Sequence, residues 1–65
     1  MDVRLTLKAA RVNSGLTQKR AAKEIGVCQK TLSAWESGKR SPRMNQLKIV
    51  CQIYGVPYDQ IFLPS

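Results

Sequence analysis

A single glycine between two short segments with helical apolar patterns is the feature that most constrains this fold. Residues 17–37, TQKRAAKEIGVCQKTLSAWES, place Gly26 between two stretches whose apolar residues recur at helical spacing. Two helices that cross at a steep angle through a short turn need a residue free to adopt a positive φ and a small side chain where they touch. Gly26 and Ala22 meet these two needs, so the segment predicts two helices hinged at Gly26.

Apolar residues are placed to back both of these helices. Thr17 is a typical N-cap for a helix that ends at Gly26, and a second helix is expected from Gln29 to Ser37. The residues expected to face inward are Ala21, Ala22, Ile25, Val27, Leu32 and Trp35. The adjacent alanines predict that another element packs closely against them. Trp35 is expected to anchor the core, because a tryptophan at helical spacing usually packs rather than stacking on bases.

A further helix is expected ahead of the hinge, over residues 3–13. Its apolar face is predicted to contain Leu5, Ala9 and Val12, which recur at helical spacing. Gly15 follows as a residue suited to the left-handed conformation after a helix. The basic residues that fall elsewhere on this helix are Arg4, Lys8 and Arg11.

Two more helices are expected after the hinge. A fourth helix ends at Gly55, and its apolar residues at three- and four-residue spacing are Leu47, Val50, Cys51 and Tyr54. Pro57 is suited to open a fifth, short helix over 58–62. No alternation typical of strands and no linker between domains is evident. The sequence therefore predicts an all-α fold, a compact bundle of five short helices forming a single domain over residues 1–65.

Charge is distributed unevenly along the 65 residues, which carry a formal net charge of +7. Ten of the eleven lysines and arginines lie in residues 1–43 with three of the four acidic residues, whereas residues 44–65 carry only Lys48 and Asp59. This asymmetry predicts a polyanionic partner for the first two thirds of the chain and a different role for the last third. A basic surface that serves only solubility is the alternative.

Composition argues against several functional classes. There is no histidine, and Cys28 and Cys51 form no CxxC pattern, so neither a metal site nor a disulfide framework is expected. Because no nucleophile lies beside a base and no carboxylates are paired, we expect no enzyme activity and no cofactor. The apolar runs are too short to span a bilayer, and no signal-peptide pattern is present. We expect a cytoplasmic, nucleoid-associated protein with no membrane partner and no small-molecule site.

The order of motifs over residues 11–62 resembles the Cro and phage-repressor type of helix-turn-helix, also called the XRE family. The run SGLTQKRAAKEIGVCQKTLSAWESGKRSPR has LTQ at the start of the second helix, G-V at the turn and a W-E-x-G-K-x-x-P segment after the third helix. The resemblance implies a lambda-repressor-like domain with a helix-turn-helix at about 17–37. It also implies a transcriptional regulator, expected to be a repressor, that binds double-stranded DNA with residues 29–37 in the major groove.

The chemistry of two surfaces predicts the DNA contacts. The side chains expected to read base edges are Gln29, Lys30, Ser33 and Ala34. Gln pairs with adenine, Lys donates to guanine, Ser is permissive, and an alanine methyl contacts the thymine methyl. The residues expected to contact phosphates are Gln18 and Lys19 at a helix N-terminus, and Lys39, Arg40 and Arg43 in the loop. The resemblance implies that Gln18 also supports Gln29.

Other residues are expected to be structural. The resemblance places Arg11 and Glu36 where the family often has a partly buried ion pair between the first and third helices. The alternative is two solvated surface charges, which interact weakly. The residues with expected structural roles are Arg11, Ala22, Gly26, Leu32, Trp35 and Glu36.

Some alternatives stay open at this point. The same fold also serves protein-interaction modules such as antitoxins and antirepressors, whose neutral last third would bind a protein. The aromatic and aliphatic residues that either form a homodimer seam or close the core are Tyr54, Tyr58, Ile61, Phe62 and Leu63. A homodimer predicts a palindromic operator with half-sites about 34 Å apart. Cys28 departs from the Ser or Thr that the family prefers at the cap of its third helix, and a thiol there permits a redox-sensitive switch.

Overall fold

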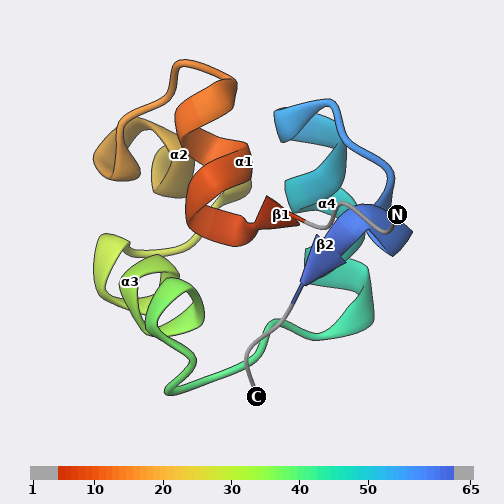
Figure 1. Cartoon of the computed structure of the whole chain (residues 1–65). Helices are drawn as coiled ribbons and strands as arrows, with labels where there is room; N and C mark the ends of the chain where they lie inside the picture. The colour runs from red at the N-terminus through yellow and green to blue at the C-terminus, as the bar shows by residue number, and fades with distance from the viewer. Residues whose placement is uncertain (1–4, 63–65) are drawn as a thin grey trace.

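Four α-helices and two very short strands make up residues 5–62, the part of the chain that the computed structural model describes. The helices are α1 (Leu7–Asn13), α2 (Gln18–Ile25), α3 (Gln29–Ser37) and α4 (Met44–Tyr54), followed by the 3₁₀ turn η1 (Tyr58–Gln60). The strands β1 (Leu5–Thr6) and β2 (Ile61–Phe62) pair in parallel. In the view of Figure 1, α2 and α3 lie to the left of the strand pair, and α4 passes behind it. The helical fold class is confirmed, with one helix fewer than predicted.

The core lies where the inner faces of the four helices meet. Ala21 and Ala22 are fully buried, and α2 packs against both α3 and α4, which confirms the close approach predicted from the two alanines. Leu32 and Trp35 of α3 are buried as predicted. The apolar stripe predicted for the fourth helix is also entirely buried, namely Leu47, Val50, Cys51 and Tyr54. Removal of this apolar surface from water is the main favourable contribution to folding.

Gly26 forms the hinge between α2 and α3 with a φ of 92°. The amides of Gly26 and Val27 both donate to the carbonyl of Ala22, at 2.9 and 3.0 Å, and so close the end of α2. A Cβ at position 26 would meet no atom within 4 Å. Glycine is therefore required here by its backbone conformation, and Ala22 provides the small side chain at the helix contact.

The first helix begins later than predicted. Residues 1–4 lie outside the described part of the chain, and α1 starts at Leu7 because Thr6 is its N-cap. The backbone of Thr6 is extended, and its hydroxyl accepts a hydrogen bond from the Ala9 amide at 3.1 Å. Since Thr6 also pairs with Phe62 in the strand ladder, the chain enters the helix directly from β1.

The prediction of which face of the first helix is buried is also wrong. Val12 is 57% exposed, whereas Leu7, Ala10 and Arg11 form the buried side of α1. Apolar spacing alone misplaced this face because one of the buried positions of the last turn belongs to an arginine. Arg11 is held inside by an ion pair that apolar periodicity does not reveal.

The predicted fifth helix over 58–62 is wrong in its second half. The chain makes one 3₁₀ turn and then becomes extended at Ile61, with φ −92° and ψ 130°, because it pairs with β1. Ile61 and Tyr54 are buried, so both close the core rather than forming an external seam. Tyr58 remains exposed, and Leu63 lies outside the described residues. None of the helices within 5–62 has the length and apolar character needed to cross a bilayer.

Candidate nucleic-acid interface

The outer face of α3 is polar and accessible. Gln29, Lys30 and Ser33 are exposed and Ala34 is half-buried, so all four predicted base-reading side chains reach the surface. A hollow of about 440 Å³ runs along this face, and we call it the α3 groove. Its lining residues are Cys28, Lys30, Thr31, Ser33, Ala34, Ser37, Lys39 and Arg40. The α3 groove thus brings three predicted base-reading residues together with two predicted phosphate contacts, while Gln29 lies outside its lining.

The basic loop after α3 is fixed to that helix by its backbone. Gly38 ends α3 with a φ of 81°, and the amides of Lys39 and Arg40 then donate to the carbonyl of Ala34 at 3.0 and 3.3 Å. The same carbonyl also accepts from the Gly38 amide and from the Ser37 hydroxyl, the latter at 3.2 Å, so the end of α3 and the start of the loop converge on one acceptor. The backbone positions of Lys39 and Arg40 are therefore fixed, and their side chains start beside the α3 groove.

Arg43 supplies the third cation of the loop, from the N-cap position of α4. Its backbone amide donates to the Gln46 side chain at 3.0 Å, and the Arg43 residue itself is exposed. Arg40 and Arg43 line a second hollow together with Cys28. These two arginines therefore lie on the same hollow as the exposed Cys28.

Gln29 is supported by a side chain of the preceding helix, as the resemblance implied. Its Nε2 donates to Oε1 of Gln18 at 3.2 Å, and Nε2 of Gln18 in turn donates to Oε1 of Glu36 at 3.2 Å. An amide nitrogen carries two hydrogens, so Gln18 retains one donor for a further acceptor. The position of Gln29 therefore depends on both α2 and the far end of α3.

Arg11 and Glu36 form a partly buried ion pair between α1 and α3. Arg11 Nε lies 2.8 Å from Glu36 Oε2, and the side chains are only 11% and 6% exposed. Arg11 also donates from Nη2 to Glu36 Oε1 at 3.4 Å and from Nη1 to the carbonyl of Leu16 at 3.0 Å. The alternative that Arg11 and Glu36 are two independent, solvated surface charges is therefore excluded. Loss of one partner would leave the other as an uncompensated buried charge.

The two cations at the start of α2 differ in their partners. Thr17 caps this helix by accepting from the Arg20 amide at 3.1 Å. The Arg20 side chain is paired with Glu24 at 3.2 Å, one turn later, whereas Lys19 is exposed. Lys19 is therefore the cation better placed to accompany an anion at this positive helix end.

Lys8 is a basic residue at this surface that the sequence prediction missed. It lines a hollow of about 350 Å³ together with Gln18, Ser33 and Ser37, between α1, α2 and α3. Lys8 lies three residues before Arg11, and residues three apart share one helix face. This spacing in the sequence could have predicted that Lys8 lies near Arg11 and the α3 helix. Lys8 extends the basic surface from α2 and the loop onto α1.

Cys28 occupies the N-cap of α3 but makes no side-chain bond to a helix amide. Its Sγ lies 3.1 Å from the hydroxyl of Thr31, and that hydrogen bond lowers the pKa of the exposed thiol. Cys51 is buried, and its burial raises the pKa of that thiol. Both cysteines are free, and residues 5–62 contain no group of three or more side chains arranged to hold a metal ion.

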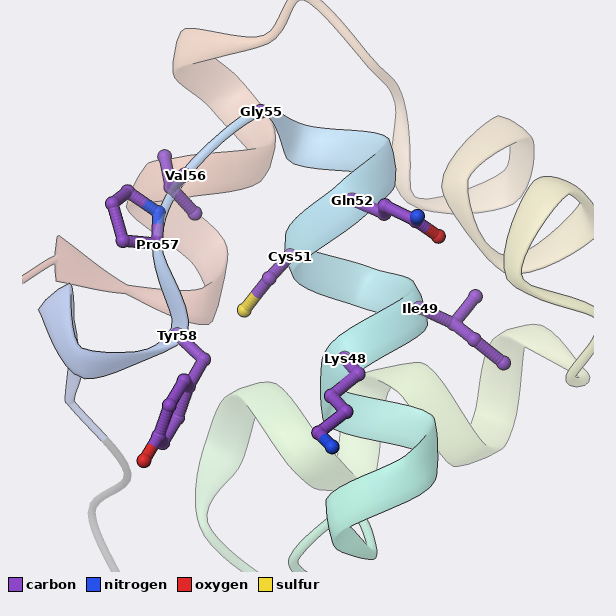
Figure 2. A pocket seen from close by; sticks show the side chains of 8 residues that line it. All are labelled: Lys48, Ile49, Cys51, Gln52, Gly55, Val56, Pro57 and Tyr58. Carbon is purple, nitrogen blue, oxygen red and sulfur yellow. The ribbon is translucent and has the colours of Figure 1, made fainter.

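A second surface lies on α4 and the turn that follows it. This α4–η1 hollow has a volume of about 550 Å³, and its lining residues are Lys48, Ile49, Cys51, Gln52, Gly55, Val56, Pro57 and Tyr58. Figure 2 shows the sulfur of Cys51 between α4 and the segment that carries Val56, Pro57 and Tyr58. Lys48 is the only charged residue of this lining, so the hollow differs in character from the α3 groove.

Comparisons with known proteins agree with this geometry. The profile of a family described as helix-turn-helix matches residues 7–61. The chain is 33% identical over 61 residues to the HTH-type transcriptional activator BcrR of Enterococcus faecalis, covering 94% of this chain and 30% of that protein. It is 33% identical over 59 residues to the cryptic phage CTXphi transcriptional repressor RstR of Vibrio cholerae, covering 91% and 53%.

A third relative, the uncharacterized HTH-type transcriptional regulator MJ0272 of Methanocaldococcus jannaschii, is 35% identical over 57 residues, covering 88% of this chain and 86% of that protein. No solved structure gives a significant match. The chain spans about a third and about half of the length of the first two relatives.

Proposed function

The chain belongs to the XRE-type helix-turn-helix family of DNA-binding regulators, and we propose that it is a sequence-specific repressor that inserts α3 into the major groove of duplex DNA. The observation that carries this proposal is the α3 groove, where Lys30, Ser33 and Ala34 are flanked by Lys39 and Arg40. Polar side chains on a helix beside fixed cations match the two kinds of contact that DNA recognition needs, base edges and phosphates.

Gln29 and Lys30 have the main reading role in this proposal. Gln29 is held by Gln18 before DNA arrives, so less side-chain entropy is lost when it pairs with an adenine edge. Lys30 is exposed in the first turn of α3 and is suited to guanine O6 and N7. Ser33 and the Ala34 methyl contact the adjacent base pair in the major groove.

Cations on both sides of α3 have the positioning role. Lys19, with the free amide hydrogen of Gln18, binds one phosphate at the N-terminus of α2, and Lys39, Arg40 and Arg43 bind the backbone on the other side. With four to five phosphate contacts per copy, the logarithm of the binding constant falls with the logarithm of salt concentration at a slope of about −4. This surplus of positive charge also favours association with the nucleoid in the cytoplasm.

A second copy of the chain docks on the α4–η1 hollow in this proposal. Two copies repel each other where basic surfaces meet, and the region 44–62 is the near-neutral part of the described chain, with only Lys48 and Asp59 charged. Ile49 and Tyr58 line the hollow in this region, and both are exposed apolar residues. The longest dimension of the molecule is 34 Å, so two copies side by side can read half-sites one helical turn apart on a palindromic operator.

The alternative function, a protein-interaction module of the antitoxin or antirepressor kind, is favoured by one observation. The α4–η1 hollow is large and mostly uncharged, as expected of a docking site for another protein. In that case the partner protein would occupy the surface assigned above to a second copy. Neither function requires enzymatic chemistry.

A titration with duplex DNA at several salt concentrations tests the proposal. We expect tight binding with a slope of about −4, and weaker binding by Lys30→Ala to the preferred sequence only. Lys23→Ala is the matched control, since it removes an equal charge from an exposed position of α2 outside the linings of the α3 groove and the α4–η1 hollow. A slope near zero, together with no effect of Lys30→Ala, contradicts DNA reading and favours the protein-interaction module.

A further inference from the structure

Glu36 is joined to Gln29 by a chain of side-chain hydrogen bonds that runs across the helix-turn-helix. Nε2 of Gln18 donates to Oε1 of Glu36 at 3.2 Å, and Nε2 of Gln29 donates to Oε1 of Gln18 at 3.2 Å. The side chain of Glu36 is only 6% exposed and is held by Arg11 at 2.8 Å, whereas Gln29 is exposed on α3. A fixed, protected acceptor is thus connected to a side chain on the surface of α3.

The direction of each donor in this chain follows from the carboxylate. The oxygen and nitrogen ends of a glutamine amide occupy similar space, so its hydrogen-bond partners decide which way the amide points. A carboxylate in an ion pair only accepts, so Gln18 has to turn its NH2 group toward Glu36. The oxygen of Gln18 then faces Gln29, which can donate to it only through its own NH2 group. Glu36 therefore sets the orientation of both amides.

This orientation decides what Gln29 can offer to a base. One of its two amide hydrogens is used by Gln18, which leaves one donor and the oxygen acceptor. The major-groove edge of adenine presents an acceptor at N7 and a donor at N6, whereas guanine presents two acceptors, N7 and O6. One donor beside one acceptor matches adenine and would place an oxygen against O6 of guanine. The reversed amide would offer two donors and would match guanine instead.

We propose that Glu36 is a positioning residue that makes Gln29 select adenine over guanine, acting through the amide of Gln18. The contact between Gln29 and a base rests on the proposed function, whereas the orientation of the two amides does not. The carboxylate that joins α1 to α3 through Arg11 thereby also sets a base preference at the other end of α3.

Glu36→Gln tests the proposal because it exchanges an acceptor for a donor. Arg11 has only donors, and its Nε lies 2.8 Å from Oε2 of Glu36, closer than its Nη2 lies to Oε1, at 3.4 Å. The oxygen of the introduced amide should therefore take the Oε2 position, and its NH2 group should face Gln18. Gln18 then has to turn its oxygen toward position 36 and its NH2 group toward Gln29. We expect both amides of the chain to reverse.

Neutron diffraction from deuterium-exchanged crystals locates the amide deuterons without DNA. In the unaltered protein the deuterons of Gln18 should point to Glu36 and those of Gln29 to Gln18. Both amides should be reversed in Glu36→Gln. If they keep their orientation in the variant, Glu36 does not control them and the proposal is overturned.

Competition binding on a duplex selected from random sequences measures the base preference. The base pair read by Gln29 is the one at which Gln29→Ala loses discrimination, and the unaltered protein should prefer adenine there. Glu36→Gln should lower the adenine-over-guanine ratio at this base pair by at least about fivefold, the lower limit for one bidentate contact, and leave the other base pairs unaffected. Glu24→Gln is the matched control, because it makes the same change in the exposed carboxylate that pairs with Arg20, and it should leave the ratio unchanged.

Glu36→Gln removes the charge that compensates Arg11, so Gln18→Met serves as the second variant if Glu36→Gln does not fold. It keeps the ion pair and removes the link, and it should leave the Gln29 amide in both orientations and lower the same ratio. A preference other than adenine at this base pair overturns the proposal, as does a ratio that the folded variant leaves unchanged or a loss that is equal at every base pair. If the unaltered protein prefers no sequence, the proposed function fails, while the neutron data still decide whether Glu36 orients the two amides.

Discussion

Residues 17–43 contain seven lysines and arginines against two glutamates, whereas residues 44–62 contain one lysine and one aspartate. Both glutamates of the first region are already paired, Glu24 with Arg20 and Glu36 with Arg11. Other cations of that region, such as Lys39 and Arg40, are exposed and line the α3 groove. In the second region, most apolar residues of α4 complete the core, whereas Met44 and Ile49 are exposed. Under the proposed function, the exposed positive charge of the first region binds DNA, whereas the apolar surface of the second region serves the core and the α4–η1 hollow.

The two regions nevertheless share one core, and the largest expected effect tests that connection. Trp35→Ala in α3 should lower the free energy of unfolding by about 3–5 kcal/mol, because Trp35 is buried against the interior. Ile49→Ala, on the exposed side of α4, should cost well under 1 kcal/mol. Chemical denaturation measures both. Two separate unfolding transitions would mean that the two regions fold independently, and a Trp35→Ala variant as stable as the unaltered protein would contradict the anchoring role of Trp35.

Base reading should belong to the first region alone. Gln29→Ala should cost about 1–3 kcal/mol of discrimination at one base pair, because it removes a paired contact and its support from Gln18. Gln52→Ala makes the same change on the exposed surface of α4 and should leave every base preference intact. Competition binding with single-base operator variants measures the difference, and equal losses from the two variants would contradict the division.

Phosphate contacts should divide in the same way, with smaller effects. Alanine at Lys39, Arg40 or Arg43 should each reduce the salt slope by about 1 and weaken all sequences alike. The same substitution at Lys48 should leave the slope unchanged. Titrations at four or five salt concentrations provide the slopes. A Lys48 effect equal to that of the loop residues would show that net charge, rather than position, governs binding.

The smallest expected difference between the two regions is in the reactivity of their thiols, since each region contains one cysteine. Cys28 is exposed and its hydrogen bond with Thr31 lowers its pKa, whereas burial raises the pKa of Cys51. Alkylation near pH 8 should therefore modify Cys28 to completion before Cys51, because the thiolate is the reactive form. Mass spectrometry of digested protein follows the two sites. Cys28→Ser should bind DNA equally under oxidising and reducing conditions, and redox-dependent binding by the native protein alone would revive a switch at this position.

Local chemistry made much of the fold predictable. Gly26 ends α2, Thr17 caps it and the stripe from Leu47 to Tyr54 is buried, because each depends on neighbours within one or two helical turns. The interior position of Arg11 was accessible only through the family resemblance, since its partner lies 25 residues away.

Features that depend on distant pairing were not predictable. The strand pair joins Leu5 to Ile61, across almost the whole described chain, and it cut short the helix expected over 58–62. In the candidate interface, the exposure of Gln29 and Lys30 followed from helical period. The proximity of Lys8 to Gln18 depends on how α1, α2 and α3 pack, which no local pattern encodes.

Selection of bound sequences from random duplex DNA tests the central claim most directly. The proposed function predicts enrichment of one palindromic motif with half-site centres one helical turn apart, and a changed preference at one position per half-site for Gln29→Ala. Enrichment of an asymmetric site or of a single half-site would support DNA reading but would contradict the proposed dimer. Failure to enrich any motif, with Lys30→Ala binding as the unaltered protein does, would contradict the claim that α3 reads DNA.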